Sequence, residues 1–195
     1  METCSQYVNN TVEIPVRGFL HRPLKPSSDW MVLTHGAGSN SQSPLLRALS
    51  LAFAGLGINV LRCDLPFRQS RPHGPPPRGA AERDQDGLRA AVEAVHQEGA
   101  TRVFLAGHSY GGRQASLVVA ADPTLAAGLL LLSYPLHPPK RPTDFRTKHF
   151  SGCGPQPCSC MEHETVLARL QKWKKLDPKF QPGMNCCLRR TLGTN

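Results

Sequence analysis

The sequence has no apolar run long enough to cross a membrane as a helix. Its most apolar stretch, residues 126–132, is far shorter than the roughly 20 residues that a membrane-spanning helix needs. The first residues also lack the basic segment and the apolar core of a signal peptide. Together these absences predict a cytoplasmic protein with no membrane span.

Paired cysteines with the spacing of a zinc site are absent as well, although the chain contains 7 cysteines. The alternative is an atypical zinc site formed by Cys153, Cys158, Cys160 and His163. Without an export signal, a disulfide framework is also unsupported. We therefore expect no metal and no cofactor.

No nucleic-acid-binding motif accompanies the basic charge of the chain. The formal net charge is +9, and residues 151–195 alone contribute 7 basic and 3 acidic side chains. A basic helix with interleaved aromatic residues is not present. We therefore predict a solvated basic surface without a specific nucleic-acid partner, with non-specific contact to polyanions as the alternative.

Apolar runs and helical patterns alternate along the chain from residue 30 to residue 133. This alternation predicts the α/β class, with a mostly parallel sheet, right-handed crossovers and helices on both faces. The expected strands are residues 11–16, 17–23, 30–34, 58–64, 102–106 and 126–133, and the expected helices are residues 44–53, 84–96 and 112–120.

The sequence Gly107-His108-Ser109-Tyr110-Gly111 lies between a predicted strand and a predicted helix. A G-x-S-x-G motif in this context forms a sharp turn that exposes a nucleophilic serine at the carboxyl end of the strand. Gly107 and Gly111 fit because the turn leaves no room for side chains on either side of the serine. Ser109 is therefore the candidate nucleophile, and an ordinary glycine-rich connection is the alternative.

A second glycine-rich loop, His35-Gly36-Ala37-Gly38, follows the strand predicted at residues 30–34. A loop at this place can donate a backbone N–H to the oxyanion that forms when a serine attacks a carbonyl group. The candidate oxyanion hole consists of the N–H groups of Ala37 and Tyr110. The alternative is a turn that needs glycine only for its backbone conformation.

Three further side chains are candidate substrate contacts at the same edge of the sheet, namely His35, His137 and Arg68. His137 follows the last predicted strand, and Arg68 begins a Pro-, Arg- and Gly-rich loop at residues 68–81 where a cation would suit an anionic substrate group. The alternatives are loop packing for His137 and a solvated, mobile loop for Arg68.

These motifs resemble those of the α/β-hydrolase superfamily, and more narrowly the small family that includes testis-expressed hydrolase-like proteins and bacterial relatives of dienelactone hydrolase. The resemblance implies hydrolysis of small ester or lactone substrates by a serine nucleophile, with a histidine base oriented by an aspartate. It covers about residues 12–150, and we predict an incomplete hydrolase-like domain at residues 1–150. The resemblance rests on HGAG at residues 35–38, CDLPF at 63–67, GHSYGGR at 107–113 and YPLHPPKRPTDFRTKHF at 134–150.

The family's later segments, which carry the aspartate and the histidine of the triad, have no counterpart in residues 151–195. We expect an irregular or disordered tail there, and a truncated sheet. One hypothesis is a shifted reading frame, because the codons from Gln156 onward permit Ala-Leu-Phe-Val-His-Gly-Thr-Arg-Asp-Gly in another frame. Residues 191–195 likewise permit Ala-Gly-His-Glu. A separate 3′ exon is the alternative.

Two functions remain open for the chain as written. One is a serine hydrolase that is weak or inactive because its triad lacks the aspartate and the histidine. The other is a non-catalytic module that binds a protein partner through the hydrolase scaffold. Loss of the strand that would follow residues 129–133 leaves an apolar edge strand, so we also expect a tendency to aggregate.

Overall fold

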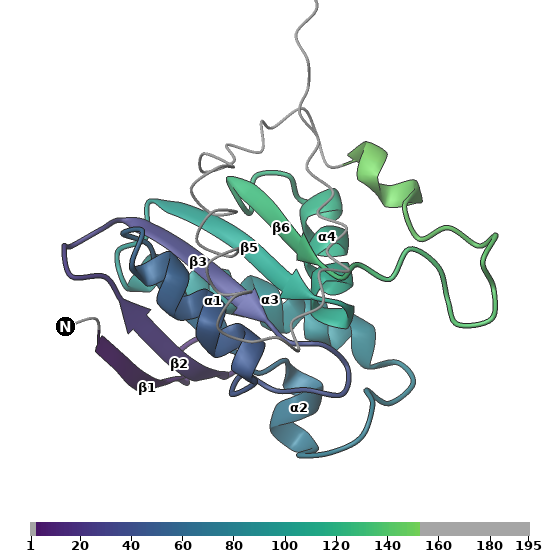
Figure 1. Ribbon diagram of the computed structural model, residues 1–195, viewed down its shortest axis with the longest axis horizontal. Coiled ribbons are helices and arrows are strands. Elements are labelled where there is room, and N and C mark those ends of the chain that lie inside the picture. Colours follow the sequence, from purple (N-terminus) through teal and green to yellow (C-terminus); the bar gives the residue numbers. More distant parts are fainter. Residues whose placement is uncertain (1–2, 153–195) are drawn as a thin grey trace, which may run out of the picture.

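The computed structural model describes residues 3–152 of the 195-residue chain. These residues form a sheet with the strand order β1-β2-β4-β3-β5-β6 and helices on both faces (Figure 1). The strands are β1 (Thr3–Asn9), β2 (Val16–Arg22), β3 (Asp29–Thr34), β4 (Asn59–Cys63), β5 (Arg102–His108) and β6 (Gly128–Leu132). The helices are α1 (Pro44–Ala54), α2 (Pro66–Ser70), α3 (Ala80–Gln97) and α4 (Tyr110–Ala121), followed by the 3₁₀ turn η1 (Lys148–Gly152).

Strands β4, β3, β5 and β6 run parallel, and β1 and β2 are antiparallel at one edge. The predicted α/β class with a mostly parallel sheet is therefore confirmed. Helix α1 connects β3 to β4 on one face, and α3 lies on the connection from β4 to β5 on the other face (Figure 1).

The two faces of the sheet have separate apolar cores, and β3 contributes to both. Trp30 and Val32 pack in the cluster that includes residues of α3 and α4. Met31 and Leu33 pack in the cluster that includes residues of α1. Alternate side chains of a strand point to opposite faces, so a strand covered on both faces is apolar throughout.

The opening hairpin differs from the prediction of strands at residues 11–16 and 17–23. The first strand is β1, and residues 10–15 connect it to β2. Tyr7 is the one buried residue of β1, so the strand has no alternating apolar pattern that the sequence could reveal. The connection contains Pro15, which has no N–H for strand pairing, and it buries Val12 in the core.

The predicted loop at residues 68–81 is shorter in the structure. Helix α2 occupies residues 66–70, with Pro66 in its first turn, and α3 begins at Ala80. The connection between them is therefore residues 71–79. Of the predicted tail at residues 151–195, residues 153–195 lie outside the described residues. Within residues 3–152, no helix is both long enough and apolar enough to cross a membrane.

Candidate active site

The carboxyl ends of β3 and β5 bring the two glycine-rich motifs together. Thr34 pairs with Gly107, so the loop that follows β3 and the turn that follows β5 begin side by side. The chain leaves β3 through α1 on one face of the sheet and enters β5 from α3 on the other face. The strand order also reverses here, because β4 and β5 lie on opposite sides of β3. Parallel sheets commonly bind ligands at such a point, outside the carboxyl ends of the strands.

Ser109 lies between β5 and α4 in a strained backbone conformation. Its φ is 50° and its ψ is −109°, and this positive φ is costly for a residue with a side chain. Its N–H donates to the Leu132 carbonyl at 2.7 Å, and its carbonyl accepts from the Arg113 N–H at 3.0 Å. The turn is therefore held by β6 on one side and by the first turn of α4 on the other.

The glycines that flank Ser109 are required by close backbone contacts. A Cβ on Gly107 would lie 2.4 Å from the Gly112 nitrogen. A Cβ on Gly111 would lie 2.4 Å from Thr34 Oγ1 and 2.5 Å from the His35 carbonyl oxygen. Because neither residue has a side chain, the start of α4 lies close to the end of β5 at Gly107 and close to the end of β3 at Gly111.

The loop at residues 35–38 packs directly against the turn that holds Ser109. A Cβ on Gly36 would lie 3.5 Å from the Ser109 Cβ and 2.9 Å from His108 Nδ1. Ala37 and Tyr110 are both half-buried. Among the hydrogen bonds of the described residues, none is donated by the N–H of Ala37 or of Tyr110. Within residues 3–152, neither N–H group therefore has a hydrogen-bond acceptor.

His35 has a structural position rather than that of a substrate contact. Its side chain is fully buried, its Nδ1 donates to the Gly36 carbonyl at 2.8 Å, and its Nε2 accepts from the Leu65 N–H at 3.2 Å. Burial lowers the pKa of His35, which favours the neutral ring that this pair of hydrogen bonds requires. With both ring nitrogens engaged, His35 has no atom to offer a substrate.

Arg68 and His137 also differ from the expectation of substrate contacts. Arg68 is 6% exposed as a residue and its guanidinium donates to four backbone carbonyl groups, so it is not part of a solvated loop. The His137 side chain is exposed and contacts the carbonyl of Pro138 at 3.1 Å. Neither side chain is hydrogen-bonded to Ser109 within the described residues, and the exposed His137 is not packed in its loop either.

A buried carboxylate close to the turn was not identified from the sequence. Asp84 in α3 is fully buried and accepts from the Tyr110 hydroxyl at 2.7 Å and from the Phe67 N–H at 3.0 Å. Burial raises the pKa of Asp84, and both hydrogen bonds oppose that rise. The sequence pattern shows Asp84 only as an acidic residue near the start of a helix, because its partners are distant in sequence. Asp84 thus links α3, α2 and the start of α4.

The structure contains a serine–histidine contact, but it does not involve Ser109. His149 Nε2 lies 2.8 Å from the Ser116 hydroxyl and 3.5 Å from the Tyr134 hydroxyl. Ser116 is fully buried in α4, two helical turns beyond Ser109. Within residues 3–152, no histidine is hydrogen-bonded to the Ser109 hydroxyl. Residues 153–195, where the family's later segments would lie, are outside the described residues.

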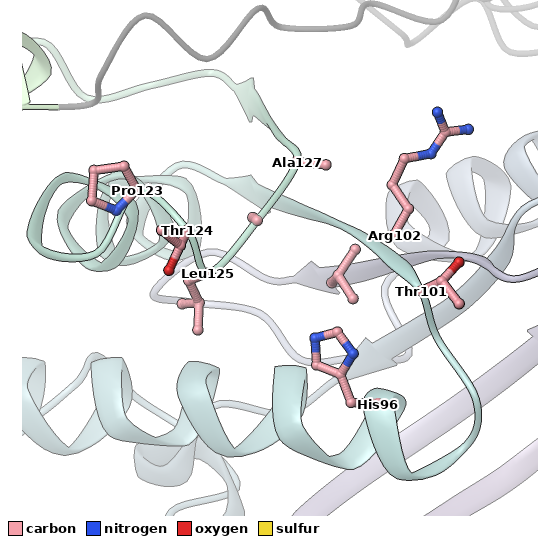
Figure 2. Close-up of a pocket in the computed structure, with 9 residues that line it drawn as sticks. His96, Thr101, Arg102, Pro123, Thr124, Leu125 and Ala127 are labelled. Atoms are coloured by element: carbon pink, nitrogen blue, oxygen red, sulfur yellow. The ribbon is translucent and has the colours of Figure 1, made fainter.

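A surface hollow of about 290 Å³ lies at the opposite ends of the strands (Figure 2). Its lining includes Thr101 and Arg102 at the start of β5, Leu125 before β6, and His96 near the end of α3. Ser109 follows the other end of β5, about 20 Å away along a strand of this length. The hollow is therefore separate from the candidate site.

In residues 3–152, no group of three or more His, Cys, Asp or Glu side chains could hold a metal ion. The cysteines of the alternative zinc site lie beyond that range.

Comparisons with known proteins agree with the fold described above. Residues 27–170 match the model of a family described as an alpha/beta hydrolase domain. A search of curated protein sequences found no significant match. The structure is similar to dienelactone hydrolase from Anabaena variabilis, with a TM-score of 0.56 and 19% identity over 67% of this chain and 62% of that one. It is also similar to TT1662 from Thermus thermophilus, with a TM-score of 0.59 and 20% identity over 93% of this chain and 86% of that one.

A third similar structure is a highly thermostable carboxyl esterase from Bacillus coagulans. Its TM-score is 0.51 and its identity is 18%, over 67% of this chain and 44% of that one. The chain thus spans less than two thirds of the dienelactone hydrolase and less than half of the esterase. At these identities the likeness establishes the fold alone.

Proposed function

The chain belongs to the alpha/beta hydrolase family, and on this premise we propose that it hydrolyses small ester or lactone substrates through Ser109. The observation that carries the proposal is the strained Ser109 at the carboxyl end of β5, with the N–H groups of Ala37 and Tyr110 free of hydrogen bonds among the described residues. Hydrolases and esterases among the structural neighbours support the same class of chemistry.

In the proposed reaction, the Ser109 hydroxyl oxygen forms a bond to the carbonyl carbon of the substrate. The π electrons of the C=O bond move to the oxygen, which accepts hydrogen bonds from the Ala37 and Tyr110 N–H groups. Return of those electrons expels the alcohol oxygen, which takes a proton, and a water molecule then releases the acyl group as a carboxylic acid. In a lactone the expelled alcohol stays attached to the acyl chain.

The reaction also needs a base for the proton of Ser109. An unassisted serine is a poor nucleophile at neutral pH. We propose that the aspartate and histidine of a complete triad belong to the segments that a restored reading frame would encode after residue 150. The oxyanion hole and substrate binding together support roughly 10³–10⁴-fold acceleration over water in hydrolases that have lost their triad, so weak activity is expected from the chain as written.

The alternative function is a non-catalytic module that uses the hydrolase scaffold to bind a protein partner. One observation favours it: no histidine within residues 3–152 is hydrogen-bonded to the Ser109 hydroxyl. The same observation limits catalysis. The two functions differ in whether the serine reacts.

A fluorophosphonate probe, which labels activated serines covalently, distinguishes them. We expect labelling of Ser109, slow in the written chain and fast in the frame-restored chain, and loss of labelling in Ser109→Ala. The matched control is Ser133→Ala, because Ser133 is exposed and also has a positive φ of 48°. A frame-restored chain that folds but is not labelled would refute the hydrolase proposal and support the binding module.

A further inference from the structure

Arg68 is a buried cation whose hydrogen bonds all go to backbone carbonyl groups. Nε donates to Ser39 at 2.8 Å, and one terminal nitrogen donates to Ala37 and Gly74 at 2.8 Å each. The other terminal nitrogen donates to Arg71 at 2.9 Å. A guanidinium buried in this way is stabilised only by such partners, because its removal from water is costly.

Two of the four acceptors belong to the loop at residues 36–39, which we call the oxyanion loop. The peptide group that carries the Ala37 N–H also carries the Gly36 carbonyl, and that carbonyl accepts from His35 Nδ1 and from the Ser39 N–H. The next peptide group carries the Ala37 carbonyl, which accepts from Arg68. Peptide groups are planar, so fixing the two groups that flank Ala37 fixes its φ and ψ and the direction of its N–H.

Arg68 is itself held in place by neighbouring residues at the start of α2. Its own N–H donates to the Leu65 carbonyl at 2.7 Å, and its guanidinium lies 4.8 Å from the centre of the Phe67 ring. The Phe67 N–H is held by the buried carboxylate of Asp84. The oxyanion loop is therefore tied through Arg68 to α2 and α3, and through Gly74 to the connection at residues 71–79.

From this geometry we propose that Arg68 is a positioning residue, which orients the Ala37 N–H toward the oxyanion formed at Ser109. The inference rests on the proposed function and adds a residue that acts through the backbone without touching the substrate. A planar guanidinium has five donors in a fixed arrangement, so lysine cannot replace it at four carbonyl groups. The stabilisation is present before the substrate binds, which is the condition for an effective oxyanion hole.

The test compares Arg68→Gln and Arg68→Lys with Arg71→Gln, a variant that removes an exposed cation from the same region and keeps the carbonyl that Arg68 contacts. Saturation kinetics of fluorophosphonate labelling separate the binding constant of the probe from the maximal labelling rate. We expect both Arg68 variants to lower the maximal rate about tenfold to a hundredfold, with the binding constant little changed, because misplaced donors affect the transition state most. We expect Arg71→Gln to match the unmodified chain.

Labelling of the Arg68 variants at the unmodified rate would overturn the proposal. A frame-restored chain that folds but is not labelled at all would instead refute the proposed hydrolase function. In that case hydrogen exchange at residues 36–39 decides the matter. Faster exchange in Arg68→Lys than in Arg71→Gln supports the positioning role, and equal exchange overturns it. Circular dichroism identifies a variant that has lost its fold, and Arg68→Lys, which keeps the charge, is then the variant to interpret.

Discussion

Gly111 lies where the start of α4 meets the end of β3, and a side chain there has no space. A Cβ would lie 2.4 Å from Thr34 Oγ1 and 2.5 Å from the His35 carbonyl oxygen, which is a backbone atom that cannot move aside alone. We expect Gly111→Ala to lower the free energy of unfolding by about 1–3 kcal/mol, the usual cost of overpacking. Urea denaturation measures the change.

Gly38→Ala is the matched control for that substitution. Gly38 belongs to the other glycine-rich motif, yet no atom lies within 4 Å of a Cβ placed on it. We expect its free energy of unfolding to stay within about 0.5 kcal/mol of the unmodified chain. Equal effects at Gly111 and Gly38 would contradict the contact between α4 and β3 described above.

His21 is a buried imidazole that makes the stability of the fold depend on pH. Its Nε2 accepts from Arg62 Nε at 2.8 Å, and burial, followed by the charges of Arg62 and Arg47, lowers its pKa from 6.5 to about 4. Between these values the unfolded chain binds a proton that the folded chain does not. Stability contributed by the neutral ring is therefore complete above pH 6.5 and is lost as the pH falls toward 4.

We expect His21→Gln to reduce this pH dependence, because a glutamine oxygen can still accept from Arg62 and does not titrate. The variant no longer binds one more proton in the unfolded state than in the folded state. The slope of the free energy of unfolding against pH therefore falls by up to about 1.4 kcal/mol per pH unit. Urea denaturation at several pH values between 4 and 7 gives the slope. An unchanged slope would mean that His21 is protonated equally in both states. Among the described residues, His35, His108 and His149 also have lowered pKa values and contribute in the same direction, whereas the raised pKa of Asp84 contributes in the opposite direction.

At the scale of elements, the sequence predicts those parts whose signals are local. Helix α1 begins where Ser43 and Pro44 predict, and the Ser43 side chain accepts from the Leu46 N–H at 3.3 Å. Strand β3 is recognisable because it is covered on both faces and its residues 30–33 are all apolar. The turn at Ser109 is recognisable because its glycines are dictated by contacts within a short segment and with β3.

Elements that depend on distant partners are not recognisable in this way. Strand β1 exposes most of its side chains and is defined by pairing with β2. Helix α2 spans five residues and is held by Asp84. For the same reason the sequence shows His35 and Arg68 as potential ligands of a substrate. Only the fold reveals that their polar atoms are engaged by backbone groups, several of them distant in sequence.

Strand β6 is the element for which we expect a tendency to associate. Within residues 3–152 it pairs with β5 on one side, and Leu129 and Leu130 are only half-buried. We expect light scattering to rise with protein concentration, and Leu130→Lys to reduce it, because charges on an edge strand oppose pairing between chains. Leu51→Lys, an equal change at an exposed position of α1, is the control. A chain that stays monomeric and unfolds cooperatively would contradict this expectation.

At the scale of the whole molecule, the parallel sheet places the proposed nucleophile beside the oxyanion loop, and under the proposed function the remaining part of the chemistry depends on residues that a restored reading frame would encode after residue 150. We expect a chain with the restored reading frame to hydrolyse a simple ester, such as p-nitrophenyl acetate, at least about 10³-fold faster than the chain as written. The expectation follows because loss of the serine or histidine of a triad costs on the order of 10⁶ in turnover, whereas the oxyanion hole supports the smaller remainder.

Sequencing the transcript and the genomic DNA across codons 145–195 is the first measurement to make. A slip of one or two bases that restores His-Gly-Thr-Arg-Asp and Ala-Gly-His-Glu would make the corrected chain the one to assay, with its aspartate and histidine as the acid and base partners of Ser109. A frame that holds as written, with a separate exon for the tail, would contradict the reading-frame hypothesis. The preserved turn at Ser109 would then have to be explained by contacts that hold α4 against β3 rather than by catalysis, and the search would turn from substrates to protein partners.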